Sequence, residues 1–375
     1  MNNLTPNNLL EGASLSQALT DLLNQEPQLL SMPEGAFPTQ LWQRLAEKRL
    51  LFPALDESFG GQKSSSLAIA KTAKTLTCLS GSAGLGMSWV MQQALVDILI
   101  KSGKQQLLQN HLPSLLSGQG LCALSISEPG AGAHPKRLST HAQQDGDCYR
   151  LNGEKTYISN GPVADIFIIL AITDVVNERK QFTAFLVPKN TEGLTIIPMK
   201  GFDALKPSSH CGLKLENCSI PALNILGEKG QAFDSISKPF REHEDILMLS
   251  PLAGAMQALL KMLIEFNPSL LNPDELGLLL AIIDSVSTLA NQAAEKLDST
   301  NMPFEPVSFI IVGRLLIEQF IQKVKQLETE QALSKPIKCL INDIDVLVNI
   351  AKTANTAKQK ALADRYLANN AVKTQ

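Results

Sequence analysis

The sequence lacks the cysteine patterns that hold metal ions or build disulfide frameworks. Its six cysteines form no CxxC pair and have no spacing typical of a metal site. We therefore expect reduced and mostly buried thiols, as in cytosolic proteins, and no metal. The sequence also lacks a strong excess of one charge, because its formal net charge is −3. This balance gives no reason to expect nucleic acid or an anionic membrane as a partner.

Signals for export or membrane insertion are missing too. Residues 1–18 contain neither the basic and apolar regions of a signal peptide nor the arginine-rich bias of a transit peptide. The apolar runs at 276–283 and 309–317 are too short to span a bilayer, because Asp284 and Arg314 interrupt them. These features predict a soluble, cytoplasmic protein with no membrane partner.

Hydrophobic periodicity divides the 375 residues into three parts. Apolar residues at helical spacing predict an N-terminal all-α domain over 1–119. Short alternating runs bounded by Gly, Pro, Asn or Asp predict a middle antiparallel β domain over 120–233. Helical spacing returns over 234–375 and predicts a C-terminal helical bundle. Its long segments are expected at 245–265, 275–297, 306–327 and 337–371. The predicted fold class is therefore α+β.

The most informative stretch of the chain runs from residue 121 to 161. A run of small and apolar residues leads directly into Glu-Pro-Gly-Ala-Gly-Ala at 128–133. A strand that breaks into such a turn brings bare backbone N–H groups close to whatever lies against it. Further along, Asn152-Gly153 between alternating segments predicts a hairpin turn. Strand side chains alternate, so the returning strand should present Tyr157 and Ser159 on one face.

Two motifs in this stretch resemble the flavin-binding signature of acyl-CoA dehydrogenases. They are Ser-Glu-Pro-Gly-Ala-Gly at 127–132 and Leu-Asn-Gly-Glu-Lys-Thr-Tyr-Ile-Ser-Asn-Gly at 151–161. Flanking segments are similar to the same family, including Glu-Ser-Phe-Gly-Gly at 57–61 and Asn-Ile-Leu-Gly-Glu-Lys-Gly at 224–230. The resemblance implies an acyl-CoA dehydrogenase-like fold of helical, β and helical domains. It also implies an FAD-dependent α,β-dehydrogenation of a thioester carried by CoA or by a carrier protein.

The resemblance also assigns residues to the cofactor. The matching positions in the two motifs are Leu124, Ile126, Ser127, Gly132, Tyr157, Ile158 and Ser159. Tyr157 matches an aromatic residue beside the dimethylbenzene ring of the flavin, and Ser159 matches a hydroxyl that hydrogen-bonds near N5. Without the family, Ser127 could simply cap a turn and Tyr157 could be an ordinary cross-strand aromatic.

Oxidation of a thioester at Cα–Cβ needs a carboxylate to take the α-proton and donors to hold the thioester carbonyl. The resemblance places the carboxylate at Glu244, before Gly-Ala-Met-Gln-Ala at 254–258, as in the isovaleryl-CoA and long-chain branch. It places Arg241 and Asp245 beside the substrate, where Asp245 replaces an arginine of that branch. A second carboxylate there would disfavour ionisation of Glu244. Alternatively, 241–245 is a charged helix start, with acids favoured by the helix dipole.

The sequence departs from the family pattern on the substrate side and near its end. Ala133-His134 stand where the family usually has Ser-Asp, so Ala133 removes a hydroxyl contact to the substrate. His134 could meet a phosphate or be an ordinary surface histidine. The last third lacks the Arg-x-x-Phe-Gly segment and the Gly-Gly-x-Gly loop that hold the ADP half of FAD in this family.

These departures leave two alternatives open. One is a catalytically impaired, acyl-CoA dehydrogenase-like pseudoenzyme that serves as a partner subunit. The other is a flavin monooxygenase or oxidase on the same fold. The usual oligomeric states of the family imply a homo-oligomer, either a dimer or a tetramer, or a hetero-oligomer with an intact paralogue. If the protein is a dehydrogenase, an electron-transfer partner would accept the electrons from the reduced flavin.

Overall fold

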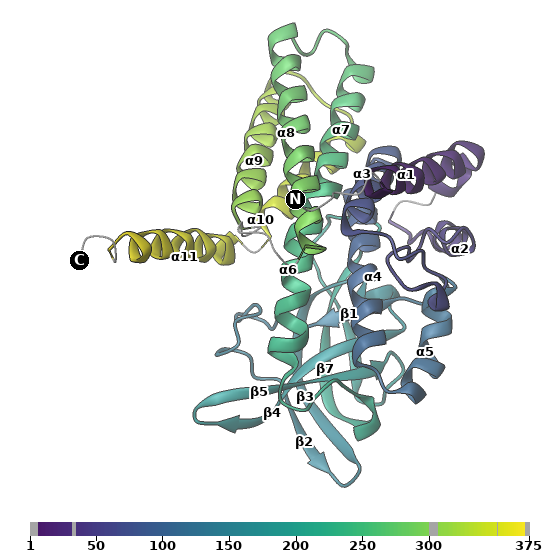
Figure 1. Ribbon diagram of the computed structural model, residues 1–375, viewed down its shortest axis with the longest axis vertical. Helices are drawn as coiled ribbons and strands as arrows, with labels where there is room; N and C mark the ends of the chain where they lie inside the picture. Colours follow the sequence, from purple (N-terminus) through teal and green to yellow (C-terminus); the bar gives the residue numbers. More distant parts are fainter. Residues whose placement is uncertain (1–6, 32–34, 300–306, 351, 372–375) are drawn as a thin grey trace.

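The computed structural model describes residues 7–31, 35–299, 307–350 and 352–371. Helices of the two chain ends lie above a sheet domain, and the last helix projects away from the body (Figure 1). The N-terminal helices are α1 Asn7–Gln25, α2 Thr39–Glu47, α3 Ser66–Ser80, α4 Ala83–Ser102 and α5 Gln105–Leu116. Ser65 and Ser82 cap α3 and α4 by accepting hydrogen bonds from backbone N–H groups of the first turn.

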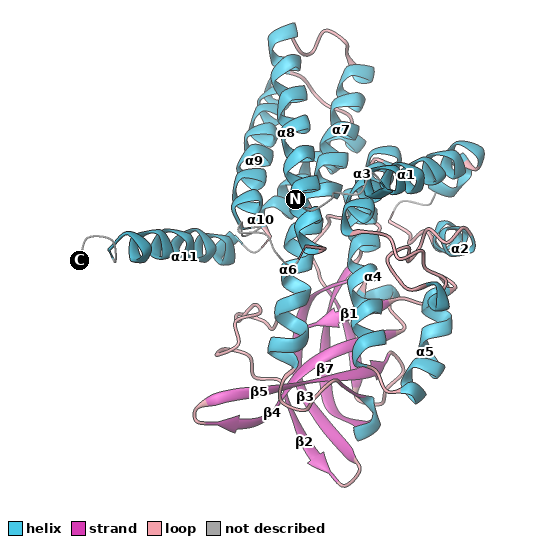
Figure 2. Ribbon diagram, viewed as in Figure 1, coloured by secondary structure: helices cyan, strands magenta, loops and turns pink. Residues whose placement is uncertain are grey.

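Eight strands form one sheet after the N-terminal helices (Figure 2). They are β1 Cys122–Ser125, β2 His141–Asp145, β3 Cys148–Ser159, β4 Ile166–Val176, β5 Arg179–Pro188, β6 Leu194–Pro198, β7 His210–Pro221 and β8 Ile225–Leu226. The order is β6-β7-β3-β2-β4-β5-β8, and β1 pairs with β4. Most pairs are antiparallel, as predicted, but β4 pairs in parallel with both β1 and β2.

The C-terminal part is helical. A π-helical turn at Phe233–Ser237 leads into α6 Lys238–Leu247, and the later helices are α7 Leu249–Phe266, α8 Pro273–Leu297, α9 Val307–Glu330, α10 Lys335–Asn349 and α11 Lys352–Ala371. Asn272 and Glu275 form a capping box at the start of α8. The α+β fold expected from the three kinds of periodicity is confirmed.

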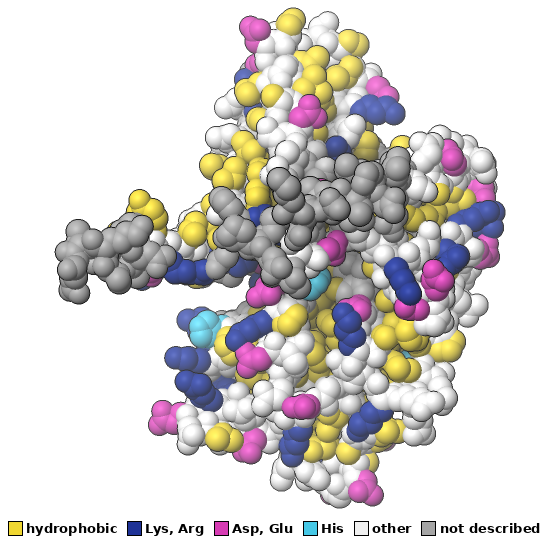
Figure 3. Space-filling model, viewed as in Figure 1, with side chains coloured by type: hydrophobic (Ala, Val, Ile, Leu, Met, Phe, Trp, Pro, Cys, Tyr) yellow, Lys and Arg dark blue, Asp and Glu magenta, His cyan; other side chains and the backbone are white. Residues whose placement is uncertain are grey.

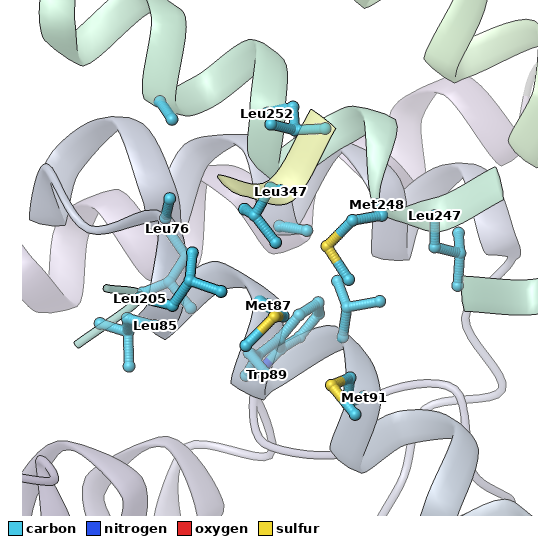
Figure 4. Close-up of a cluster of buried hydrophobic side chains, with 14 of the residues drawn as sticks. Leu76, Leu85, Met87, Trp89, Met91, Leu205, Leu247, Met248, Leu252 and Leu347 are labelled. Carbon is cyan, nitrogen blue, oxygen red and sulfur yellow. The ribbon is translucent and has the colours of Figure 1, made fainter. Parts of the chain in front are cut away.

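Two large hydrophobic cores and a small third cluster around Ile246, Ala293 and Ile310 hold the described elements together. The larger is continuous from the N-terminal helices, across one side of the sheet, to the C-terminal helices. The second large core lies within the sheet domain, around side chains such as Phe167 and Phe185. In the larger core, Met87, Trp89 and Met91 of α4 lie beside side chains of the C-terminal helices (Figure 4). The helix α4 thus joins the first and last thirds of the chain.

Three of the described helical segments are long and apolar enough, by length and composition alone, to cross a membrane. They are Ala83–Ser102, Phe233–Phe266 and Pro273–Leu297. Burial inside the protein accounts for the apolar character of the first two, whose apolar windows are 78% and 83% buried. In α8 only 33% of the window is buried, so much of its apolar surface is left uncovered by the chain itself.

The predicted hairpin turn at Asn152-Gly153 is wrong, because both residues lie inside strand β3. The register of β3 against β7 shifts at this point, and Gly153 has a φ of 144°, which marks a β-bulge. A Cβ at position 153 would lie 2.5 Å from Thr140 Oγ1, so glycine is needed for the close approach. The turn between β2 and β3 falls instead at Gly146, with a φ of 59°.

The single segment predicted over 337–371 is two helices, α10 and α11. The backbone of Ile350 is extended, with φ −57° and ψ 133°. Arg314 Nη1 donates to the carbonyl oxygens of Val348 at 2.8 Å and Ile350 at 2.9 Å. A side chain from α9 therefore satisfies carbonyls at the end of α10. Because no glycine or proline marks this break, the local sequence could not have predicted it.

Close packing of α7 on α3 depends on Gly254, and a substitution tests this directly. A Cβ at 254 would lie 2.3 Å from the carbonyl oxygen of Lys74 in α3. We expect Gly254→Ala to lower the free energy of unfolding by about 1–3 kcal/mol, because the two helices must move apart. The control is Gly277→Ala in α8, where nothing lies within 4 Å of the added Cβ. That variant should be stabilised by about 0.5–1 kcal/mol. Urea denaturation measures both, and equal effects would contradict the packing argument.

Candidate active site

The candidate site begins at the turn that follows β1. Glu128 N–H donates to Gly132 O and Gly132 N–H donates to Glu128 O, each at 3.0 Å, which closes a tight loop. Gly130 and Gly132 have φ values of 71° and 57°, in the left-handed region that favours glycine. Thr156 N–H donates to Ser127 O at 2.9 Å and so fixes the loop against β3. The two motifs singled out in the sequence are therefore neighbours in space.

A buried ion pair between Lys155 and Glu128 holds the 127–132 loop in place. Lys155 Nζ donates to Glu128 Oε1 at 3.0 Å and to Ile126 O at 3.1 Å, and the two side chains are 0% and 4% exposed. Glu128 also accepts from the backbone N–H groups of Ser139 and Thr140. Burial raises the pKa of Glu128, but Lys155 and these hydrogen bonds outweigh it and lower that pKa to about 2. The carboxylate is therefore ionised, and it ties the loop to β2 and β3.

Tyr157 is exposed and Ser159 half-buried, with buried Ile158 between them. Tyr157 has a φ of 56°, and the register of β3 against β7 shifts between Lys155 and Ile158, so a β-bulge interrupts the alternation that the sequence predicted. Tyr157 is 61% exposed, which is unusual for so large an aromatic side chain. Its ring lies edge-on to Phe202, with 6.4 Å between centroids. Ser159 Oγ lies 3.0 Å from His210 Nε2, and the His210 ring lies 4.6 Å from the ring of Phe202. An aromatic and a hydroxyl thus share one surface.

A pocket of about 260 Å³ adjoins this surface. Its lining comes from the β3–β4 connection, β6, and the segment between β6 and β7: Pro162, Ile196, Pro198, Met199, Phe202, Ala204, Lys206, Ser209 and His210. Asp343 of α10 holds this last segment by accepting from Leu205 N–H at 2.6 Å. Burial raises the pKa of Asp343 to about 6. The C-terminal helices therefore help to shape the pocket.

The predicted base, Glu244, lies on α6, which runs beside α4 and leads from the sheet to the C-terminal helices (Figure 1). Its side chain is 26% exposed, and Glu244 Oε2 lies 3.6 Å from Arg241 Nε. Burial raises the pKa of Glu244, and Asp245 adds to this effect, whereas Arg241 opposes it. A carboxylate with a raised pKa is a stronger base once it is ionised.

Asp245 does not have the geometry of a substrate contact. Its side chain is 5% exposed, and its Oδ1 lies 3.6 Å from Arg314 Nη2 of α9. Its Oδ2 accepts a short hydrogen bond from Lys358 of α11. Both carboxylate oxygens thus meet cations from later helices. The residue predicted beside the substrate is instead part of a buried charge network.

The remaining predicted residues differ in how they could meet a ligand. Leu124, Ser127 and Ala133 are half-buried, and Gly132 is exposed. Ile126 and Ile158 are 9% and 1% exposed and pack in the two cores, so a ligand would meet chiefly their backbone. His134 is exposed. Lys155, Glu128, His210 and Asp343 were missed as site residues, because their role depends on pairings between distant segments.

Comparison with known proteins decides the family. The model of the acyl-CoA dehydrogenase N-terminal domain matches residues 17–119, and that of the acyl-CoA dehydrogenase middle domain matches residues 123–218. Together they cover more than half of the chain. The chain belongs to the acyl-CoA dehydrogenase family. Neither of these two models extends into 219–375, where the sequence lacks the family's glycine-rich loop.

Individual relatives agree with this assignment. Mitochondrial isovaleryl-CoA dehydrogenase from Solanum tuberosum is 29% identical over 60% of this chain and 54% of its own length. The chain therefore spans about half the length of the curated relatives it matches. Two solved structures share the fold over nearly the whole chain. The FAD complex of PigA has a TM-score of 0.80 at 22% identity, covering 98% of this chain and 99% of that one. The prolyl acyl carrier protein oxidase AnaB has a TM-score of 0.77 at 23% identity, covering 97% and 100%.

Proposed function

We propose that this protein binds FAD and oxidises the Cα–Cβ bond of an acyl thioester. The observation that carries the proposal is the surface formed by the 127–132 loop and β3. The loop is fixed by a buried ion pair, and the neighbouring strand presents the exposed Tyr157 ring and the Ser159 hydroxyl. Membership in the acyl-CoA dehydrogenase family supports the same cofactor. PigA, a protein of similar fold, is known as an FAD complex.

The residues present fit a flat aromatic cofactor. A largely exposed tyrosine gains buried area when a ring stacks on it, and loop N–H groups can donate to ring heteroatoms. Tyr157 and Ser159 would hold the isoalloxazine, with the 127–132 loop at its edge. When bound, FAD supplies a hydride acceptor for the substrate β-carbon.

The chain's own contribution to the chemistry is the carboxylate of Glu244. It takes the proton from the substrate α-carbon, which is only weakly acidic, so a base of raised pKa is suited to the step. Arg241, 3.6 Å away, favours the ionised form of Glu244 and so opposes the rise of its pKa. Asp245 neutralises Arg314 and Lys358, two cations that would otherwise weaken the base.

The visible absorption spectrum of the untreated purified protein tests the proposal. A flavin spectrum that bleaches on anaerobic addition of an acyl thioester is the expected result. Colourless protein that takes up no FAD in excess cofactor would instead favour a pseudoenzyme subunit. Rapid oxygen consumption by the reduced protein would favour an oxidase or monooxygenase. Matched thioesters of CoA and of a phosphopantetheinyl carrier protein, compared in the same assay, identify the carrier.

The protein also assembles with itself through its C-terminal helices. Hydrophobic side chains gather on the face of α8 and α9, and α11 projects from the body (Figure 3). The exposed members are Leu278, Leu280, Val312, Leu315, Leu362, Tyr366 and Leu367, at 39% to 70% exposure. A helix that projects from the body, as α11 does, gains most of its stability from tertiary packing. A second copy of the chain would supply that packing.

Charge placed on this face should separate the copies. Light scattering coupled to size exclusion is expected to show an oligomer for the wild type. Leu315→Asp should shift the mass toward the monomer, because a carboxylate would be buried against an apolar partner. Val175→Asp on strand β4 is the control, since Val175 is 56% exposed, close to the 52% of Leu315. An unchanged mass for Leu315→Asp would place the interface elsewhere.

A further inference from the structure

We propose that His210 is a positioning residue that orients the Ser159 hydroxyl toward the flavin, an inference that rests on the proposed function. Ser159 ends β3 and His210 begins β7, and the two residues are direct partners across the antiparallel pair. Ser159 Oγ and His210 Nε2 are 3.0 Å apart. The strand register therefore places the imidazole next to the one hydroxyl assigned to flavin N5.

The imidazole is held rigidly by its surroundings. Its ring packs against Phe202, with 4.6 Å between centroids, and it lines the 260 Å³ pocket. Phe202 in turn contacts Tyr157, so the two residues assigned to the flavin are joined through His210 and Phe202. A histidine locked in this way presents Nε2 in one direction only, and the Ser159 hydroxyl must turn to suit it.

The protonation state of His210 decides which way the hydroxyl turns. The pKa of His210 is lowered to about 4, chiefly by burial and also by Lys206, while a hydrogen bond with the Ser208 backbone opposes this shift. The ring is therefore neutral at physiological pH and carries one N–H. Its Nδ1 is buried, and no described atom lies in good hydrogen-bond geometry with it, whereas Ser159 Oγ lies 3.0 Å from Nε2. We therefore place the proton on Nε2, where Ser159 can accept it.

The tautomer of His210 decides whether Ser159 donates or accepts the hydrogen bond between them. Nε2–H donates to Ser159 Oγ, which uses one of the two lone pairs of that oxygen. The Ser159 O–H is then free to donate outward, to the acceptor nitrogen of an oxidised flavin. With the opposite tautomer, Ser159 would spend its proton on the histidine and could offer the flavin only a lone pair. His210 thus makes Ser159 a donor without touching the cofactor.

A double-mutant cycle on FAD binding tests this coupling. His210→Phe keeps a ring against Phe202 and removes the hydrogen bond, Ser159→Ala removes the hydroxyl, and the third variant carries both changes. We expect each single change to weaken FAD binding about five- to tenfold and to shift the flavin absorption maximum. The double variant should bind no more weakly than Ser159→Ala alone. His210→Gln, which retains a side-chain donor, should recover most of the affinity. His134→Phe is the surface control.

A second measurement does not depend on bound flavin. Nitrogen-15 NMR of histidine-labelled protein should show, for the imidazole whose signal is lost in His210→Phe, a neutral ring protonated at Nε2 that shifts in Ser159→Ala. Additive losses in the cycle, wild-type affinity in His210→Phe, or a proton on Nδ1 would each overturn the positioning role. Wild-type protein that binds no FAD would sink the proposed function, and the NMR result would still decide whether His210 orients Ser159.

Discussion

Replacing Glu244 by glutamine should leave FAD bound and abolish its reduction by substrate. The amide cannot take the α-proton, and loss of a positioned general base costs about 10²- to 10⁴-fold in rate. Rapid-mixing absorbance at the flavin maximum measures the reductive step directly. Glu242→Gln is the matched control, because Glu242 lies on the same helix and its side chain is exposed. Substrate bleaching in Glu244→Gln at the wild-type rate would remove Glu244 from the mechanism.

The same residue predicts the pH dependence of the reductive step. Only ionised Glu244 can accept a proton, so the rate should be constant at high pH and fall as the pH drops through the pKa of Glu244. Burial raises this pKa above its ordinary value of 4.5, so the fall should occur at a higher pH than for a free glutamate. Asp245→Asn should move it to lower pH, since Arg314 and Lys358 would then act on Glu244 without compensation. A profile unchanged by Asp245→Asn would contradict this charge balance.

Removing the ammonium of Lys155 should have the largest effect on stability. Lys155→Met leaves the buried Glu128 carboxylate without its cation, and breaking a buried ion pair costs about 3–5 kcal/mol. Urea denaturation should show this loss, and FAD affinity should fall with it because the loop is no longer braced. The control is Lys214→Met on β7, which breaks the exposed pair with Glu216 and should change little.

A double change separates the charge from the shape. Glu128→Gln combined with Lys155→Met leaves no unpaired buried charge, so it should recover much of the stability that Lys155→Met loses. If the double variant is as unstable as Lys155→Met, packing around the pair is what matters, and the electrostatic account of the loop fails.

The sequence was sufficient for the architecture because the fold depends on periodicity. Alternation and helical spacing survive wherever a face is buried, and they gave the order of helices, strands and helices. They misled at Gly153, because a glycine required by the nearby Thr140 side chain looks the same as one required by a turn. The break at Ile350 was missed because it depends on a guanidinium from another helix.

The site was predictable to the extent that it is local. Tyr157 and Ser159 lie two residues apart on β3, so their proximity follows from the sequence, although the β-bulge at Tyr157 does not. The partners of these residues come from elsewhere: Lys155 meets Glu128, and His210 meets Ser159. Asp245 illustrates the limit, since its neighbour in sequence suggested a substrate contact and its partners in space are Arg314 and Lys358.

The ion pairs of Asp245 connect three helices, α6, α9 and α11. One acid on α6 is matched by a guanidinium on α9 and an ammonium on α11, so replacing the acid alone would remove the carboxylate that both cations share. A different terminal helix joined to this protein would have to supply its own cation beside Asp245 in place of Lys358. A change in α11 therefore also changes the electrostatic surroundings of Glu244.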